Sequence, residues 1–339
     1  MNMRKMSLIC LITAFCLTLG ACGRAGGAET AAGGVSVTAT VFPAYDFARQ
    51  IVGDRGEVTL LVPPGAESHS YEPTPQDILR LQSSTLLVAN GGESEAWLDA
   101  VTDSLDTLPP TVYMLDEVSA LAEETVEGMQ SGGILSRAHD DHAGHNHAHE
   151  HEHDDDHDAE HNEPEYDEHV WTSPKNAAAI CEAIADKLCA LDAENAEYYR
   201  ANCAAYTEKL LTLDARFRAV AEGAAHRTLI FADRFPVRYF TEEYGFEYYA
   251  AFPGCADDAE PSARTVAFLI DTVRRENVPA VFYIEFSNEK MADIIAEETG
   301  CKTLLFHSCH NVTTDELENG VSYLALMEQN LENLKEAVN

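Results

Sequence analysis

Positively charged residues are scarce in this 339-residue sequence, which has 22 Lys and Arg against 58 Asp and Glu and a formal net charge of −36. So acidic a chain repels phosphate backbones, which argues against nucleic acid as a partner. The same charge attracts cations, although part of the excess comes from one acidic segment in the middle of the chain. With 45% hydrophobic residues, the chain still has enough apolar side chains to build two domains.

Paired-cysteine and zinc-protease motifs are also absent. None of the nine cysteines forms a CxxC pair, which argues against a structural zinc knuckle. The motif HExxH does not occur either, which argues against the common zinc hydrolases. An even number of cysteines follows the N-terminal region, and this permits disulfides without indicating how they pair. They are Cys181, Cys189, Cys203, Cys255, Cys301 and Cys309.

Long apolar runs are lacking, and the one short run near the N-terminus extends from Leu8 to Leu19. It is too short for a spanning helix, and with the basic residues before it the pattern is typical of a secretory signal. The small residues that end on Cys22 resemble a bacterial lipobox, so we expect residues 1–21 to be a signal peptide and Cys22 to carry lipid. Residues 22–34, rich in Gly and Ala, are predicted to be a flexible tether. The alternative is an ordinary cleaved signal and a free protein.

Histidine is concentrated in one segment. Nine of the 14 histidines lie between residues 139 and 161, with Asp and Glu filling the gaps. Because almost nothing there is apolar, we predict a solvated, mobile loop over residues 137–166. Imidazole mixed with carboxylate suits ions such as Zn²⁺, so we interpret the loop as a low-affinity metal collector, with a solvated acidic linker as the alternative. The histidines are His139, His142, His145, His147, His149, His151, His153, His157 and His161.

Strand and helix patterns alternate along the rest of the chain. Runs such as 35–41 and 57–62 read as strands, and segments with helical spacing separate them. This alternation predicts an α/β protein with parallel sheets flanked by helices. We expect an N-terminal lobe over residues 35–173 and a C-terminal lobe over residues 224–339. Residues 174–223 between them contain apolar side chains at helical spacing, and neither Gly nor Pro interrupts them before the end.

Two histidines stand next to distinctive motifs. His69 follows the Pro63-Pro64-Gly65 turn that closes a predicted strand, and α/β proteins place ligands at such strand ends. His169 lies where the acidic loop gives way to Val170-Trp171.

These motifs, LLVPPGAESHSYEPTPQD at residues 60–77 and DEHVWTSPKNA at residues 167–177, resemble the cluster A-I solute-binding proteins of bacterial zinc and manganese ABC importers. The resemblance extends from about Val35 to the C-terminus and includes the His-rich loop. It implies a monomeric, lipid-anchored, extracytoplasmic receptor that delivers Zn²⁺ to a membrane permease and catalyses no reaction. It also implies two lobes joined by one long, stiff helix, and it assigns metal binding to His69 and His169.

Two positions depart from the family pattern. Where the family usually has a ligating His or Glu after a strand, this sequence has Ala232. The adjacent Asp233 is a candidate ligand, a support for a ligand, or a partner of Arg234 or Arg238. Where the family usually has an Asp after the last strand, this sequence has His307. Imidazole at that position keeps ligation possible and favours zinc over manganese.

The predicted ligands are therefore His69, His169 and His307, with a carboxylate or water completing a tetrahedron. Further candidates are Asp233, Glu285, Cys309 and His310, while Cys309 is also a candidate for a disulfide with Cys255 or Cys301. The predicted function is high-affinity Zn²⁺ capture for an ABC importer. The alternatives are a Mn²⁺-importing homologue, a metal-buffering or sensing lipoprotein, and a secreted zinc hydrolase with Glu285 or Asp233 as base.

Overall fold

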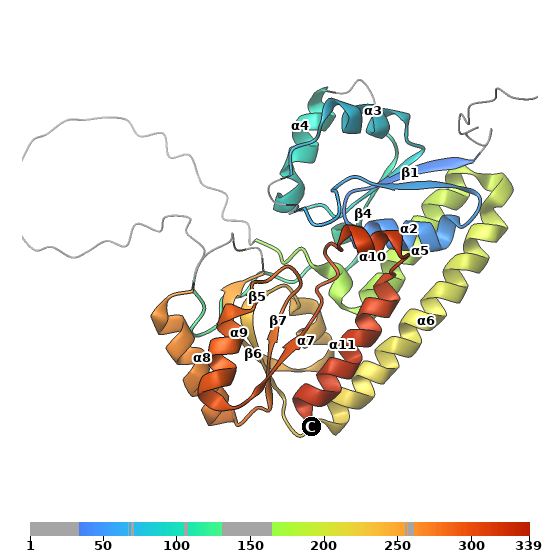
Figure 1. Cartoon of the computed structure of the whole chain (residues 1–339). Coiled ribbons are helices and arrows are strands. Elements are labelled where there is room, and N and C mark those ends of the chain that lie inside the picture. The colour runs from blue at the N-terminus through green and yellow to red at the C-terminus, as the bar shows by residue number, and fades with distance from the viewer. Residues whose placement is uncertain are drawn as a thin grey trace, which may run out of the picture. The chain divides into compact units, whose positions relative to one another are not determined.

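The structure is a computed structural model that describes residues 34–66, 68, 71–104, 108–130, 165–254, 256 and 261–339. Residues Val35–Asn339 form one compact unit, which contains two four-stranded sheets (Figure 1). Several predictions concern positions outside the described residues: the signal peptide, Cys22, the tether, His69, Cys255 and the nine-histidine segment.

The N-terminal sheet has the strand order β2-β1-β3-β4, and all neighbouring strands are parallel. Strand β3 is buried at every position, as is usual for a central strand covered on both faces. Helix α2 contacts β1, β2 and β3. The elements of this lobe are β1 (Val35–Ala39), α2 (Phe42–Val52), β2 (Gly56–Leu60), α3 (Pro75–Ser83), β3 (Leu86–Ala89), η1 (Glu93–Glu95), α4 (Ala96–Ser104), β4 (Thr111–Tyr113) and η2 (Met114–Glu117).

The C-terminal sheet has the order β6-β5-β7-β8 and is also parallel throughout. Helices α8 and α9 contact β5, and α11 contacts β7 and β8. Aromatic rings fill this core, with Phe231 stacked on Phe282 at 5.2 Å between centroids. The elements are β5 (Thr228–Phe235), α7 (Arg238–Tyr244), β6 (Glu247–Pro253), α8 (Ala263–Glu276), β7 (Ala280–Tyr283), α9 (Lys290–Thr299), β8 (Lys302–Leu305), α10 (Thr314–Glu318) and α11 (Tyr323–Val338).

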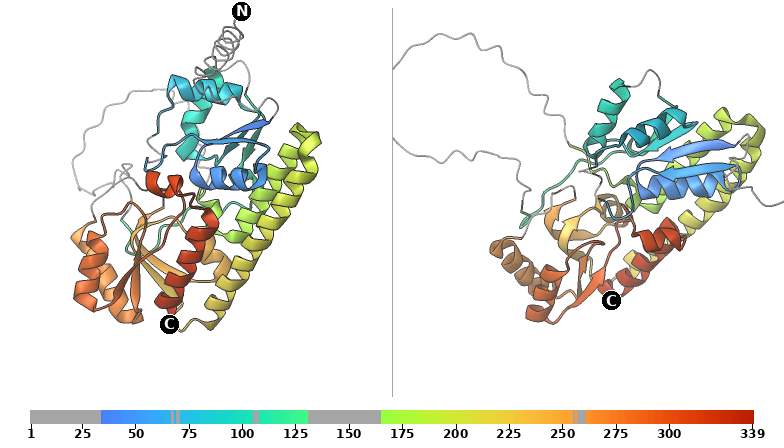
Figure 2. Two further views of the ribbon diagram at one scale, coloured as in Figure 1. Left: turned by 45° about the vertical axis from the view of Figure 1, so that its right-hand side comes forward. Right: turned by 45° about the horizontal axis from the view of Figure 1, so that its top comes forward.

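Between the lobes the chain forms a short turn, η3 (Val170–Thr172), and then two helices rather than one continuous helix. Ser173 caps α5 (Pro174–Leu191), and after η4 (Ala193–Asn195) the 28-residue helix α6 (Ala196–Gly223) follows. The break lies at Asp192, whose carboxylate accepts hydrogen bonds from Asn195 and Tyr199 at 2.8 and 2.7 Å. Such side-chain bonding competes with helix continuation. Helices α5 and α6 then pack side by side (Figure 2).

A buried carboxylate joins three helices from distant parts of the sequence. Asp46 in α2 is fully buried and accepts hydrogen bonds from the Tyr206 hydroxyl of α6 at 3.1 Å and the Tyr323 backbone N–H of α11 at 2.9 Å. Arg49 pairs with the same carboxylate. One hydrophobic core includes residues from both lobes and from α5 and α6. A site formed by both lobes is therefore held by a shared hydrophobic core and by a buried carboxyl group whose oxygens are hydrogen-bonded to three helices.

The predicted fold class, two parallel sheets flanked by helices with a long helix between the lobes, is confirmed by this arrangement. Within the part of the chain that the structure describes, no helix has the length and apolar content needed to cross a membrane.

Candidate metal centre

The carboxyl ends of strands from both sheets border one cavity of about 230 Å³. From the N-terminal lobe come residues that follow β1 and β2, and from the C-terminal lobe residues at or after the ends of β5, β6, β7 and β8. Ligand sites in α/β proteins are expected at this edge. The polar and small residues at the cavity include Ser68, His169, Arg234, Gly254, Glu285 and His310.

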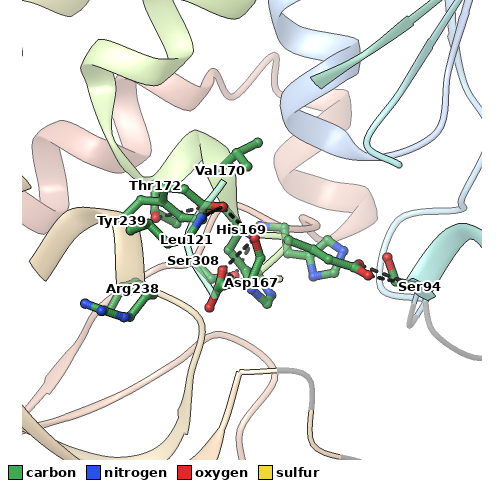
Figure 3. A network of polar contacts seen from close by, with 12 residues as sticks. Ser94, Leu121, Asp167, His169, Val170, Thr172, Arg238, Tyr239 and Ser308 are labelled. Carbon is green, nitrogen blue, oxygen red and sulfur yellow. Dashed lines mark hydrogen bonds and ion pairs between the residues drawn. The ribbon is translucent and has the colours of Figure 1, made fainter. Parts of the chain in front are cut away.

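His169 is oriented by the aspartate two residues before it (Figure 3). Its Nδ1 lies 3.2 Å from Asp167 Oδ1, and the same oxygen accepts the His169 backbone N–H at 2.8 Å. The Tyr239 hydroxyl donates to the Asp167 carbonyl at 2.7 Å, which holds the pair against α7. Because Asp167 engages Nδ1, Nε2 is the nitrogen left for a ligand. A carboxylate behind a histidine is the usual companion of a metal-binding imidazole.

The protonation of His169 reflects opposing effects. Burial acts to lower its pKa, because the charged form loses water, and the nearby Arg234 acts in the same direction. The charge and hydrogen bond of Asp167, together with the charge of Glu168, outweigh both and raise the pKa of His169 above its ordinary value. Protons therefore compete for this imidazole more strongly than for a free histidine.

Glu168 fastens the same segment to the N-terminal lobe. Its carboxylate accepts the Ser94 backbone N–H at 3.0 Å, and its carbonyl accepts from the Asn90 side chain at 3.0 Å. Gly92, at φ +89°, leaves room for this contact, because a Cβ there would lie 2.4 Å from Glu168 Oε1. Gly254, just after β6, likewise leaves room for His169. A Cβ at this position would lie 3.2 Å from His169 Cε1 and 2.8 Å from the Phe235 carbonyl.

His310 reaches the cavity from the loop after β8. The residue before it, Cys309, has φ +63°, a left-handed conformation that is uncommon for a residue with a Cβ. The turn directs His310 towards His169, and the ring centroids are 5.5 Å apart. Its Nε2 lies 2.8 Å from the Ser68 hydroxyl. Two imidazoles from different lobes thus meet at one cavity.

The loop that carries His310 is also tied to the loop that leads to residue 69. The Asn311 side chain donates to the carbonyls of Pro63 and Ala66 at 2.9 and 2.7 Å, and the Gly65 N–H donates to the Val312 carbonyl at 2.9 Å. Ala66 and Ser68 both line the cavity. Although His69 itself lies outside the described residues, the chain on its N-terminal side is held against this cavity.

His307, expected as the third ligand, is placed differently. Its backbone N–H and carbonyl are both paired with the Asn330 side chain of α11 at 2.8 Å. Its Nδ1 accepts the Cys309 backbone N–H at 2.9 Å. The side chain is buried, and it is not among the residues that line the cavity. The structure therefore brings His310, a further candidate in the sequence, to the cavity beside His169, while His307 supports the loop.

The remaining candidates have structural partners. Asp233 accepts the backbone N–H of Arg234 at 2.8 Å and of Ile284 at 3.4 Å, and burial raises its pKa; it closes the irregular end of β5 rather than lining the cavity. Glu285 does line the cavity, but its carboxylate accepts both the N–H and the hydroxyl of Ser308.

The Cys309 thiol is fully buried, which raises its pKa well above the ordinary range, and it points to the His307 carbonyl. Cys301 and Cys309 are both free thiols, so the alternative disulfide between them is not formed. A pairing of Cys309 with Cys255 concerns a residue outside the described part.

Among the described residues, no three His, Cys, Asp or Glu side chains form a group able to hold a metal. His169 and His310 alone provide two imidazoles, so a metal at this cavity needs a further donor.

Two parallel α/β lobes with a histidine-lined cavity at their strand ends define a solute-binding protein of the metal-binding class. A family model described as "Zinc-uptake complex component A periplasmic" (ZnuA) matches residues 37–337, and the chain belongs to this family. The family contains solute-binding components of uptake complexes, so the expectation that the protein is not an enzyme is confirmed.

Relatives and solved structures agree with this assignment. The high-affinity zinc uptake system protein ZnuA of Bacillus subtilis is 30% identical over 338 residues, covering 99% of this chain and 98% of the relative. The zinc-binding lipoprotein AdcA of Streptococcus pneumoniae is 30% identical over 344 residues, covering 98% of this chain but only 61% of the relative.

The crystal structure of the metal-dependent lipoprotein YcdH of Bacillus subtilis has a TM-score of 0.70 at 28% identity, covering 90% of this chain and 100% of that one. The Zn(II)-bound ZnuA-like domain of AdcA from Streptococcus pneumoniae has a TM-score of 0.69 at 26% identity, covering 90% and 99%.

Proposed function

We propose that this protein captures one Zn²⁺ ion at the cavity and delivers it to the permease of an ABC importer. Family membership and zinc-named relatives that align over nearly the whole chain support this function. The observation that carries it in this chain is the meeting of His169 and His310 at one cavity, with ring centroids 5.5 Å apart. Zn²⁺ is the cargo in this proposal and not a resident cofactor.

The proposed ligands are His69, His169 and His310. Three neutral imidazoles suit Zn²⁺ better than Mn²⁺, which prefers oxygen donors. The carboxylates near the cavity support this preference, because the oxygen donors that Mn²⁺ would need are already hydrogen-bonded. Asp167 is bonded to His169, and Glu285 is bonded to Ser308. A solvent molecule in the fourth position would complete the tetrahedral coordination that zinc prefers.

The features outside the described residues complete the proposal. Lipid on Cys22 would attach the protein to the outer side of the cytoplasmic membrane, with residues 22–34 as a tether. The histidines between residues 139 and 161 would raise the local concentration of ions near the cavity. We further propose that the protein acts as a monomer with lobe boundaries at residues 173 and 224.

Calorimetric titration of Zn²⁺ and Mn²⁺ into the purified protein tests the function. We expect one tight Zn²⁺ equivalent, additional weak equivalents from the His-rich segment, and weaker Mn²⁺ binding. Deleting residues 140–163 should remove the weak equivalents and keep the tight one. If the deletion removes nearly all zinc binding, the protein is a metal buffer or sensor, and the receptor proposal is wrong.

A further inference from the structure

We propose that Trp171 is a positioning residue for the metal ion, because its indole sets the separation and the relative angle of the His169 and His310 imidazoles. The proposal rests on the function proposed above, in which these two side chains hold Zn²⁺. It adds a residue that does not bind metal to the set that determines affinity.

The three rings form a nearly equilateral triangle. The centroid of the Trp171 ring lies 5.5 Å from that of His169 and 5.3 Å from that of His310, while the two imidazole centroids are 5.5 Å apart. All three contacts are tilted or edge-to-face, the arrangements that aromatic pairs prefer. Each imidazole is therefore held on one side by the same rigid surface.

Trp171 is itself held by two hydrogen bonds, one at its indole and one at its backbone carbonyl. The indole N–H donates to the Ser308 carbonyl at 2.8 Å, and the Trp171 carbonyl accepts the Tyr323 hydroxyl at 2.6 Å. Ser308 lies two residues before His310 and is held in turn by Glu285. The indole thus connects the segment that carries His169 directly to the loop that carries His310.

A tryptophan that is fully buried also contributes to the hydrophobic core, and core filling is the simpler explanation of its presence. Two observations favour a positioning role. Among the described residues, its ring contacts are with the two proposed ligands, and its only polar side-chain atom bonds to the His310 loop. Metal ligands need their angles held within about 10–20°, and a buried indole whose N–H is bonded to Ser308 and whose backbone is bonded to Tyr323 supplies such rigidity.

The test compares Trp171→Phe with Trp97→Phe in the full protein. Trp97, the other tryptophan, packs on Tyr71 in the N-terminal lobe and is not among the residues that line the cavity, so it controls for the loss of an indole that touches neither His169 nor His310. For each protein, zinc affinity is measured by competition with a chelator, stability by urea unfolding, and geometry by the visible absorption spectrum of the Co²⁺-loaded form.

We expect Trp171→Phe to weaken Zn²⁺ binding about 10-fold to 100-fold, the range seen for groups that orient metal ligands, and to change the Co²⁺ spectrum. Trp97→Phe should change neither. Tyr323→Phe, which removes only the bond to the Trp171 carbonyl, should weaken binding by about 3-fold to 10-fold; it keeps the test valid if Trp171→Phe does not fold.

If Trp171→Phe lowers stability but leaves affinity and the Co²⁺ spectrum unchanged, or if Tyr323→Phe folds with unchanged affinity, Trp171 only fills the core. Failure of the wild-type protein to bind zinc tightly would instead overturn the proposed function.

Discussion

Replacing His310 with alanine should weaken zinc binding far more than the same change three residues earlier at His307. Both histidines follow β8, and both are candidates by sequence. Only His310 lines the cavity, where its ring lies beside His169. The Nδ1 of His307 is occupied by the Cys309 N–H, and its backbone is paired with Asn330. The two variants therefore separate a ligand from a support of the same loop.

We expect His310→Ala to lose mainly zinc affinity and His307→Ala to lose mainly folding stability. Loss of the His310 imidazole removes a ligand, so we expect more than about 100-fold weaker Zn²⁺ binding, since groups that merely orient a ligand are worth 10-fold to 100-fold. His307→Ala leaves the buried Cys309 N–H without its acceptor, which costs about 1–3 kcal/mol of folding free energy. The effect of His307→Ala on zinc affinity should stay within about 10-fold, because this residue acts on the metal only through the loop.

Chelator competition measures affinity in both variants, and urea unfolding without metal measures stability. His307→Asn serves as the control, because its side-chain oxygen can still accept the Cys309 N–H, and it should recover most of the stability lost in His307→Ala. The reasoning is wrong if His307→Ala abolishes tight zinc binding while His310→Ala retains it.

Two further predictions concern protons. Burial lowers the pKa of His169, but Asp167 and Glu168 raise it more, so zinc affinity should already fall on acidification from a pH above 6.5. In Asp167→Asn this loss of affinity should move to lower pH, while affinity at pH 8 drops about 10-fold to 100-fold. Calorimetry across pH 5.5 to 8 measures both effects, and a loss of affinity at the same pH in both proteins would contradict the role given to Asp167. Burial also raises the pKa of Glu95 to about 7 from 4.5. Because its folded-state pKa lies above the unfolded one, the unfolded chain releases this proton first, and stability is lost as pH rises from about 4.5 to about 7. Glu95→Gln should remove up to about 3 kcal/mol of this pH dependence, measured by urea unfolding at pH 5 and pH 8, and an identical pH slope in both proteins would count against it.

Local patterns were sufficient for most of the fold. The strands predicted over residues 35–41 and 57–62 are confirmed as β1 (Val35–Ala39) and β2 (Gly56–Leu60), since apolar alternation and strand-closing turns depend only on neighbours in sequence. The break between α5 and α6 was not predictable in the same way, because Asp192 is stabilised by Tyr199, seven residues further on. Helices α7, α10 and α11 were not predicted, although Thr313 and Glu316 form a capping box that marks the start of α10.

The site was predictable in part. The motif around His169 identified a cavity residue, and the carboxylate that orients it is only two residues away. The choice between His307 and His310 was not accessible, because it depends on the left-handed conformation of Cys309 and on Asn330 from an unpredicted helix. A short-range pattern shows two histidines after a strand, but tertiary partners decide which of them faces the cavity.

The hydrogen bonds from Asn311 to Pro63 and Ala66 have a consequence for how fast cargo leaves. They fasten the loop that carries His310 to the segment that leads to His69. Asp46 and the shared core hold the lobes together. We therefore expect release of the ion to require local opening of this loop, whose free-energy cost is smaller than that of global unfolding. A permease that competed for the Asn311 side chain would accelerate unloading without any need to separate the lobes.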